Sequence, residues 1–179
     1  MATPIFNFEK TIHAALYVAE KIKIKDFHKI FKILYFADRE HLAKYGRTIT
    51  GDTYIKMKDG PVPSKLYDIF KAIRGDSFFP AGTLGDYFSV HGERYIMPEK
   101  KPDLSYLSQT DVAELDESIS KYGEMPFGAL REISHDIAWS SAPDNGKIIV
   151  ENMLREVGED EEYISYVAEV MNCQNAFLQ

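Results

Sequence analysis

Apolar side chains recur every three or four residues along most of the chain, a spacing typical of amphipathic helices. One such face predicts a helix from about Phe8, and a second predicts a helix that Asp26 caps and Gly46 ends. A third predicted helix has Ser64 as its cap and Gly75 as its stop. A fourth predicted helix follows Ser108, which resembles a capping box with Asp111. A fifth follows Pro126 and directs Phe127, Leu130, Ile133 and Ile137 inward. A short helix is predicted within 148–157, and a last one from Glu159 directs Ile164, Val167, Ala168 and Met171 inward.

Two shorter stretches predict strands. Residues 53–58 alternate weakly between apolar and polar side chains and run into the turn sequence Asp59-Gly60-Pro61. Segments 86–90 and 94–98 flank a glycine-containing turn, which predicts a β-hairpin. We therefore expect an α+β, predominantly helical protein: a compact multi-helix domain of six or seven helices with a small antiparallel β-element. No repeat or boundary interrupts the pattern, so residues 1–179 are expected to form one domain.

Composition narrows the class of protein. The single cysteine, Cys173, excludes an internal disulfide framework and a zinc site built from several cysteines. No stretch approaches the roughly 18 to 20 apolar residues that span a bilayer. Residues 1–9 lack the basic and apolar regions of a signal peptide. We therefore expect a cytoplasmic protein with no membrane association.

Charge divides the chain into two unlike parts. Residues 1–76 carry 14 basic and 9 acidic side chains, whereas residues 77–179 carry 7 basic and 19 acidic ones. Phosphate contacts need clustered cations, so an acidic chain is unlikely to bind nucleic acid on its own. A basic stripe of Lys25, Lys29 and Lys32 keeps open a regulatory, DNA-associated function for the first two helices, or contact with an acidic partner.

Two polar clusters could carry chemistry, but each has a simpler structural reading. Asp38 and His41 share a helix face, yet no ligand pair accompanies them, so we expect a buried aspartate with an arginine partner. Ser134, His135 and Asp136 are adjacent along one helix and point in different directions, which argues against a catalytic triad. We expect no catalytic residue, metal or cofactor, and a metal-dependent hydrolase on Asp38, His41 and His135 is the weakest alternative.

The most unusual local sequence is Gly60-Pro61-Val62-Pro63-Ser64. Each proline restricts the residue before it, so the segment is extended and rigid. Its simplest role is a corner that leads into the third helix. The alternative is a binding role, because the free N–H groups of a helix start can hold an anion.

These motifs together resemble the Panacea domain, the SocA-like antitoxin domain found in toxin–antitoxin pairs and phage-associated proteins. The resemblance rests on Lys32-Ile33-Leu34-Tyr35-Phe36-Ala37-Asp38, Tyr45-Gly46, Ile49-Thr50-Gly51-Asp52, Gly60-Pro61-Val62-Pro63, Leu66-Tyr67, Ser134-His135 and Ala138-Trp139. It implies a mainly helical module that neutralises a cognate protein toxin by direct contact, with no catalysed reaction. Some relatives add a DNA-binding domain, and one type hands its toxin to a protease. The acidic C-terminal part would suit a basic toxin. The residues that we take as candidate contacts lie in the motifs that carry the resemblance: Tyr35, Asp38, Arg39, Gly60, Pro61, Val62, Pro63, Tyr67 and Trp139.

Overall fold

Helices dominate the computed structural model, which describes residues 1–78 and 80–177. The described residues form eight α-helices, two short 3-10 turns and two antiparallel hairpins, so the expected α+β, predominantly helical class is confirmed. The helices are α1 (Phe8–Lys21), α2 (Phe27–Tyr45), α3 (Ser64–Arg74), α4 (Gln109–Tyr122), α5 (Phe127–Ser134), α6 (Ile137–Ser140), α7 (Val150–Glu156) and α8 (Glu161–Phe177). The strands are β1 (Tyr54–Met57), β2 (Gly60–Pro63), β3 (Phe88–His91) and β4 (Tyr95–Pro98).

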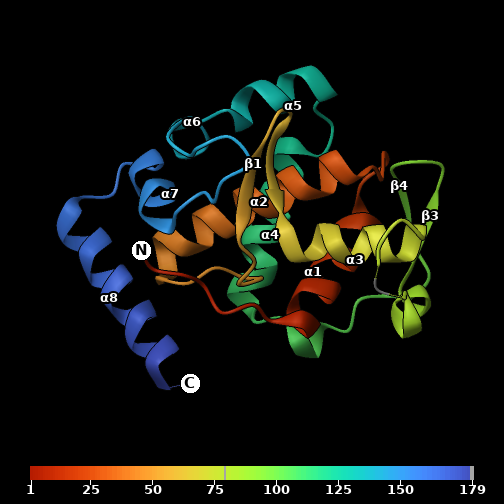
Figure 1. Cartoon of the computed structure of the whole chain (residues 1–179), viewed down its shortest axis with the longest axis horizontal. Coiled ribbons are helices and arrows are strands. Elements are labelled where there is room, and N and C mark those ends of the chain that lie inside the picture. Colours follow the sequence, from red (N-terminus) through yellow and green to blue (C-terminus); the bar gives the residue numbers. More distant parts are fainter. Residues whose placement is uncertain (79, 178–179) are drawn as a thin grey trace.

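Helix α2 runs through the middle of the molecule and joins two apolar clusters (Figure 1). The Asp26 carboxylate caps it by accepting a hydrogen bond from the Lys29 N–H at 2.7 Å. Gly46 ends it in the left-handed conformation, as expected. One side of α2 packs with α1, α3, α4 and the β3–β4 hairpin, and the other packs with α5 to α8. Such a helix is buried on nearly every face.

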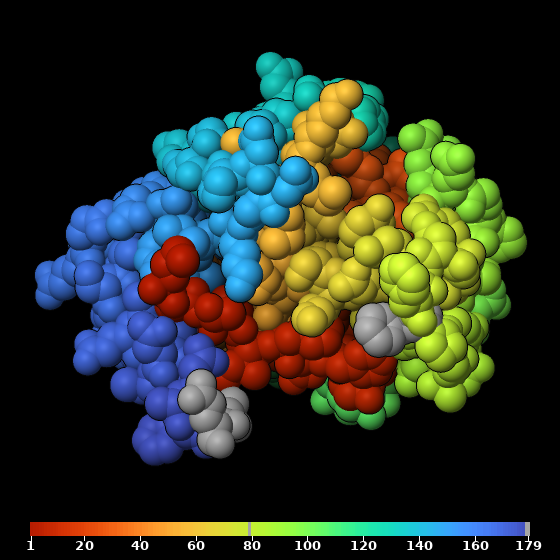
Figure 2. Space-filling model, in the orientation of Figure 1, coloured from red at the N-terminus to blue at the C-terminus, as the bar shows by residue number. Residues whose placement is uncertain are grey.

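The β1–β2 hairpin contains one strand more than the sequence predicted. Gly60–Pro63, expected to be a rigid corner, pairs with β1 as an antiparallel strand and then continues directly into α3. Pro61 lies opposite Lys56 and Pro63 opposite Tyr54. These prolines cause no loss of pairing because β2 is an edge strand of this sheet. On the other side of the hairpin, the Ile148 N–H donates to the Tyr54 carbonyl at 2.8 Å, so residues before α7 cover β1 (Figure 2).

Two predicted helix boundaries are wrong. The helix expected to extend from Pro126 through Ile137 ends at Ser134, and Asp136 caps the separate helix α6 by accepting from the Trp139 N–H at 2.8 Å. Leu130 is buried as predicted, but Ile137 is 54% exposed, and Phe127 and Ile133 are also exposed. Ser64 does not cap α3 either.

The helix start is held instead by the buried carboxylate of Asp52. It accepts from the N–H groups of Lys65 at 3.0 Å and Leu66 at 2.9 Å. A side chain twelve or more residues upstream thus replaces the local cap that the sequence suggested.

The last two helices lie at the end of the molecule away from the β3–β4 hairpin (Figure 1). The Tyr163 hydroxyl of α8 donates to the Ala43 carbonyl of α2 at 2.8 Å. The Ala2 N–H donates to the Glu151 carboxylate of α7, so the N-terminal segment also contacts this end. Among the described helices, none has the length and apolar character needed to cross a membrane.

Candidate partner-binding site

Asp38 is a buried structural anchor, and its partner is not an arginine. The carboxylate accepts from the N–H groups of Ile49 at 2.6 Å and Thr50 at 3.1 Å. It also accepts from the Thr50 hydroxyl at 2.6 Å and the Tyr54 hydroxyl at 2.8 Å. Burial raises the pKa of Asp38, and these donors oppose that rise. The side chain therefore fixes the loop between α2 and β1 and has no exposed surface for a partner.

Arg39 and Tyr35 both contact Asp136, which was expected to hold a helix end and does cap α6. The Tyr35 hydroxyl donates to the Asp136 carboxylate at 2.7 Å, and Arg39 donates to the same oxygen at 3.0 Å. Burial, together with the nearby Asp136 charge, raises the pKa of Tyr35 well above its usual range, so its hydroxyl remains a donor. This contact ties α2 to the start of α6.

The Ser134-His135 pair forms no nucleophile and base. The Ser134 hydroxyl donates to the Arg131 carbonyl of its own helix at 2.8 Å. The His135 ring stacks on Trp139, with ring centroids 3.7 Å apart. Burial lowers the pKa of His135, which keeps the stacked ring neutral. His41 is separately engaged by the Arg47 carbonyl and the Thr110 hydroxyl. In 1–78 and 80–177, no three His, Cys, Asp or Glu side chains are grouped so that they could hold a metal ion.

The predicted basic stripe on α2 is wrong. Lys29 is buried and donates to the carbonyls of Gly123 and Met125, each at 2.8 Å. Lys32 is only 1% exposed and donates to the Pro61 carbonyl at 2.8 Å. Both ammonium groups thus hold neighbouring backbone in place, and they present no cationic surface to nucleic acid.

Lys32 also determines how closely the hairpin approaches the helices. Gly60 has a φ of +106°, and a Cβ built there would lie 2.3 Å from the Ser134 hydroxyl oxygen and 2.5 Å from the Lys32 Cε. Only glycine fits this position. Burial lowers the pKa of the Lys32 amine to about 7, because the ammonium loses most of its hydration.

Two surface grooves flank the tip of the β1–β2 hairpin, and residues 57 and 58 line both. We call the one of about 390 Å³ that is lined by Phe31 and Tyr67 the hairpin groove. Its aromatic walls include Phe31 and Tyr67, whose ring centroids are 5.8 Å apart. The His28 and Phe127 rings, 4.2 Å apart, lie at its α5 end. The groove on the other side, about 410 Å³, is lined by Trp139, whose indole N–H donates to the Met57 carbonyl at 3.0 Å.

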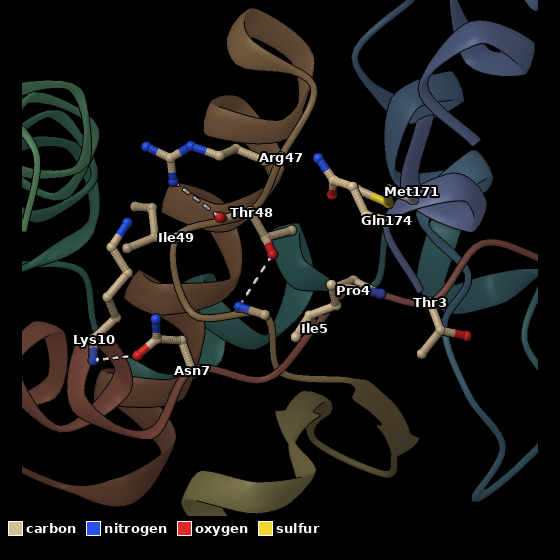
Figure 3. A pocket seen from close by; sticks show the side chains of 11 residues that line it. Thr3, Pro4, Ile5, Asn7, Lys10, Arg47, Thr48, Ile49, Met171 and Gln174 are labelled. Carbon is tan, nitrogen blue, oxygen red and sulfur yellow. Dashed lines mark hydrogen bonds between the residues drawn. The ribbon is translucent and has the colours of Figure 1, made fainter. Parts of the chain in front are cut away.

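A third, smaller pocket of about 180 Å³ lies between the N-terminal segment, the 47–51 loop and α8 (Figure 3). Lys10 and Arg47 line it, but both extend to the buried Asp111 carboxylate, at 2.6 Å and 3.0 Å. Although burial opposes the shift, hydrogen bonds from His41 and Lys10 hold the pKa of Asp111 well below its usual range. These cations are therefore already paired, and the pocket has fewer unpaired charged groups for a partner than the hairpin groove.

The structure divides the predicted contact residues into two groups. Val62 and Tyr67 line the hairpin groove, and Trp139 lines the groove beside it. The other candidates are buried and build the scaffold: Tyr35, Asp38, Arg39, Gly60, Pro61 and Pro63. Sequence reasoning missed the groove residues Phe31, Lys58 and Arg94, because no local motif marks them.

In structural terms, the chain is a mainly helical α+β domain with a rigid hairpin between two surface grooves. Residues 30–140 match the family described as "Antitoxin SocA-like, Panacea domain", and the chain belongs to that family. The resemblance noted from the sequence is therefore confirmed. No curated protein matches the chain, and no solved structure does.

Proposed function

We propose that this protein is an antitoxin that neutralises a co-encoded protein toxin by direct contact and catalyses no reaction. Family membership across residues 30–140 is the observation that carries the proposal. The matched segment contains α2 from residue 30 onward, both hairpins and α5, and therefore most of the residues that line the hairpin groove; Phe27 and His28 precede it. We further propose that residues 1–179 act as one binding unit in the cytoplasm.

We propose that the toxin contacts the hairpin groove. The residues that dominate a protein–protein interface usually fill pockets on the partner, and this groove can hold such a side chain. The acidic start of α8, which the charge distribution had suggested, is a weaker candidate. Arg155 pairs with Glu161 there at 2.7 Å, and Asp160 accepts from the Tyr163 N–H at 2.8 Å. Those acids already stabilise the helix start.

The test is co-expression of this chain with the product of the neighbouring gene. We expect that product to arrest growth alone, and growth to recover when both are expressed and co-purify. A Lys58→Glu/Arg94→Glu variant should weaken co-purification and rescue, while a Lys65→Glu/Lys101→Glu variant, with the same charge change on exposed residues outside the groove, should not. A neighbouring product that is harmless, or remains toxic and unbound, refutes the antitoxin role.

A further inference from the structure

The hairpin groove combines apolar walls with a cationic rim. Phe27, Phe31, Val62 and Tyr67 form its walls, and Phe27 and Phe31 belong to the same aromatic cluster. Phe27 and Phe31 are only 6% and 3% exposed, so the apolar area open to a partner comes from Val62, Tyr67 and the 45% exposed Phe127. Its volume of about 390 Å³ suits one or two large side chains rather than a flat interface.

The charges around the groove are opposite in sign to the chain as a whole. The protein carries a formal charge of −7, yet the exposed rim of the groove carries Lys58, Arg74 and Arg94 against Asp59 and Glu93. Arg74 is already paired with Asp76 at 2.5 Å. Asp59 is already paired with Arg131 at 3.0 Å. Lys58 and Arg94 are exposed, and in the described part of the chain neither has an ion-pair partner within 4.0 Å. The groove therefore attracts negative charge.

Lys32 lies beneath the groove lining, with a side chain that is 1% exposed. Its ammonium makes one hydrogen bond, to the Pro61 carbonyl, although such a group has three donors. No carboxylate of the described residues forms an ion pair with it. Its neighbours are His28 and Asp26 on its own helix side, Asp59 in the turn, and His135 beyond α5. Burial, and then the Lys32 charge, lowers the pKa of His28 to about 4, so that ring stays neutral near pH 7.

We propose that the hairpin groove receives an acidic, apolar segment of a partner protein, with a large apolar side chain in the groove and carboxylates against Lys58 and Arg94. This inference rests on the proposed function for the partner's identity, but the chemistry of the segment follows from the groove alone. Apolar side chains supply the contact area, and complementary charge sets specificity and the rate of encounter.

The test uses a phage-displayed library of random 12-residue peptides on the immobilised full chain, with counter-selection on Lys58→Glu/Arg94→Glu. We expect enriched peptides to combine an aromatic or large aliphatic residue with Asp or Glu. Labelled copies of these peptides should bind the charge-reversed variant at least tenfold more weakly, and Lys65→Glu/Lys101→Glu within twofold of the unchanged protein. Enrichment of basic peptides, equal losses in both variants, or no groove-dependent enrichment overturns the proposal.

Peptides that bind while the neighbouring gene product stays unbound would refute the antitoxin role and leave the groove's chemistry standing.

Discussion

Replacing Lys32 with methionine should stabilise the protein at low pH, although it removes a hydrogen bond. The folded-state pKa of Lys32 is about 7, against 10.5 for an ordinary lysine. Each pKa unit corresponds to about 1.4 kcal/mol, so the buried ammonium costs about 5 kcal/mol below pH 7. Methionine fills similar space without charge, but it leaves the Pro61 carbonyl without its donor, at a cost of about 1 to 3 kcal/mol. The expected net gain at pH 6 is about 2 to 4 kcal/mol.

The sign of the pH dependence gives the sharper test. Between pH 7 and 10.5 the unfolded chain holds a proton that the folded protein has lost, so the unchanged protein gains stability as pH rises. The advantage of Lys32→Met should therefore shrink by about 3 kcal/mol between pH 6 and 9.5. Urea unfolding of both proteins at each pH, followed by far-UV circular dichroism, measures this difference. Lys65→Met, which replaces an exposed lysine on α3, should shift stability by under about 0.5 kcal/mol at either pH. A Lys32→Met protein less stable than the original at pH 6, or a difference that does not narrow, refutes the reasoning.

Three further predictions concern the scaffold around the groove. Asp38→Asn should lower the unfolding free energy by about 2 kcal/mol, because the amide nitrogen replaces an oxygen that accepts from the Thr50 and Tyr54 hydroxyls. Unchanged urea unfolding would show that these hydrogen bonds contribute little to stability. Gly60→Ala should lower the unfolding free energy by at least about 2 kcal/mol more than Gly75→Ala does. Both glycines have positive φ, but of the two only Gly60 has atoms within 4 Å of a new Cβ. Equal losses in thermal unfolding would mean that backbone strain alone sets the cost. Pro61→Ala should lower stability by about 1 kcal/mol through the unfolded chain, whereas an unchanged melting temperature with lost peptide binding would make this strand a contact site.

Local signals were sufficient to predict both ends of α2 and the start of α4. Asp26 and Gly46 bound α2, and Ser108 and Asp111 form the predicted capping box, because caps involve neighbours within one turn. The break after Ser134 also carries a local signal, because Asp136 caps α6 by accepting from the Trp139 N–H three residues on. Local patterns could not show that Asp136 also pairs with Tyr35 and Arg39, which are about one hundred residues away along the chain.

The candidate site shows the same limit. Lys29 and Lys32 were interpreted as a surface stripe because lysines on one helix face usually meet solvent. Their acceptors are carbonyls of Gly123, Met125 and Pro61, which only the tertiary structure brings near. A partial signal was present, since the residues around Lys32 are apolar on every face, a pattern that indicates a helix buried all round.

The two prolines of β2 limit the ways in which any partner can engage the hairpin. A proline nitrogen has no hydrogen to donate, and the Pro61 carbonyl is already occupied by Lys32. Residues 145–148 take up the opposite edge of the sheet through β1. An incoming extended segment thus finds no free ladder on this sheet and cannot extend it by main-chain strand addition. A partner must therefore be recognised through its side chains. Its amino-acid identities at a few positions, rather than its capacity to form a strand, will decide whether it binds.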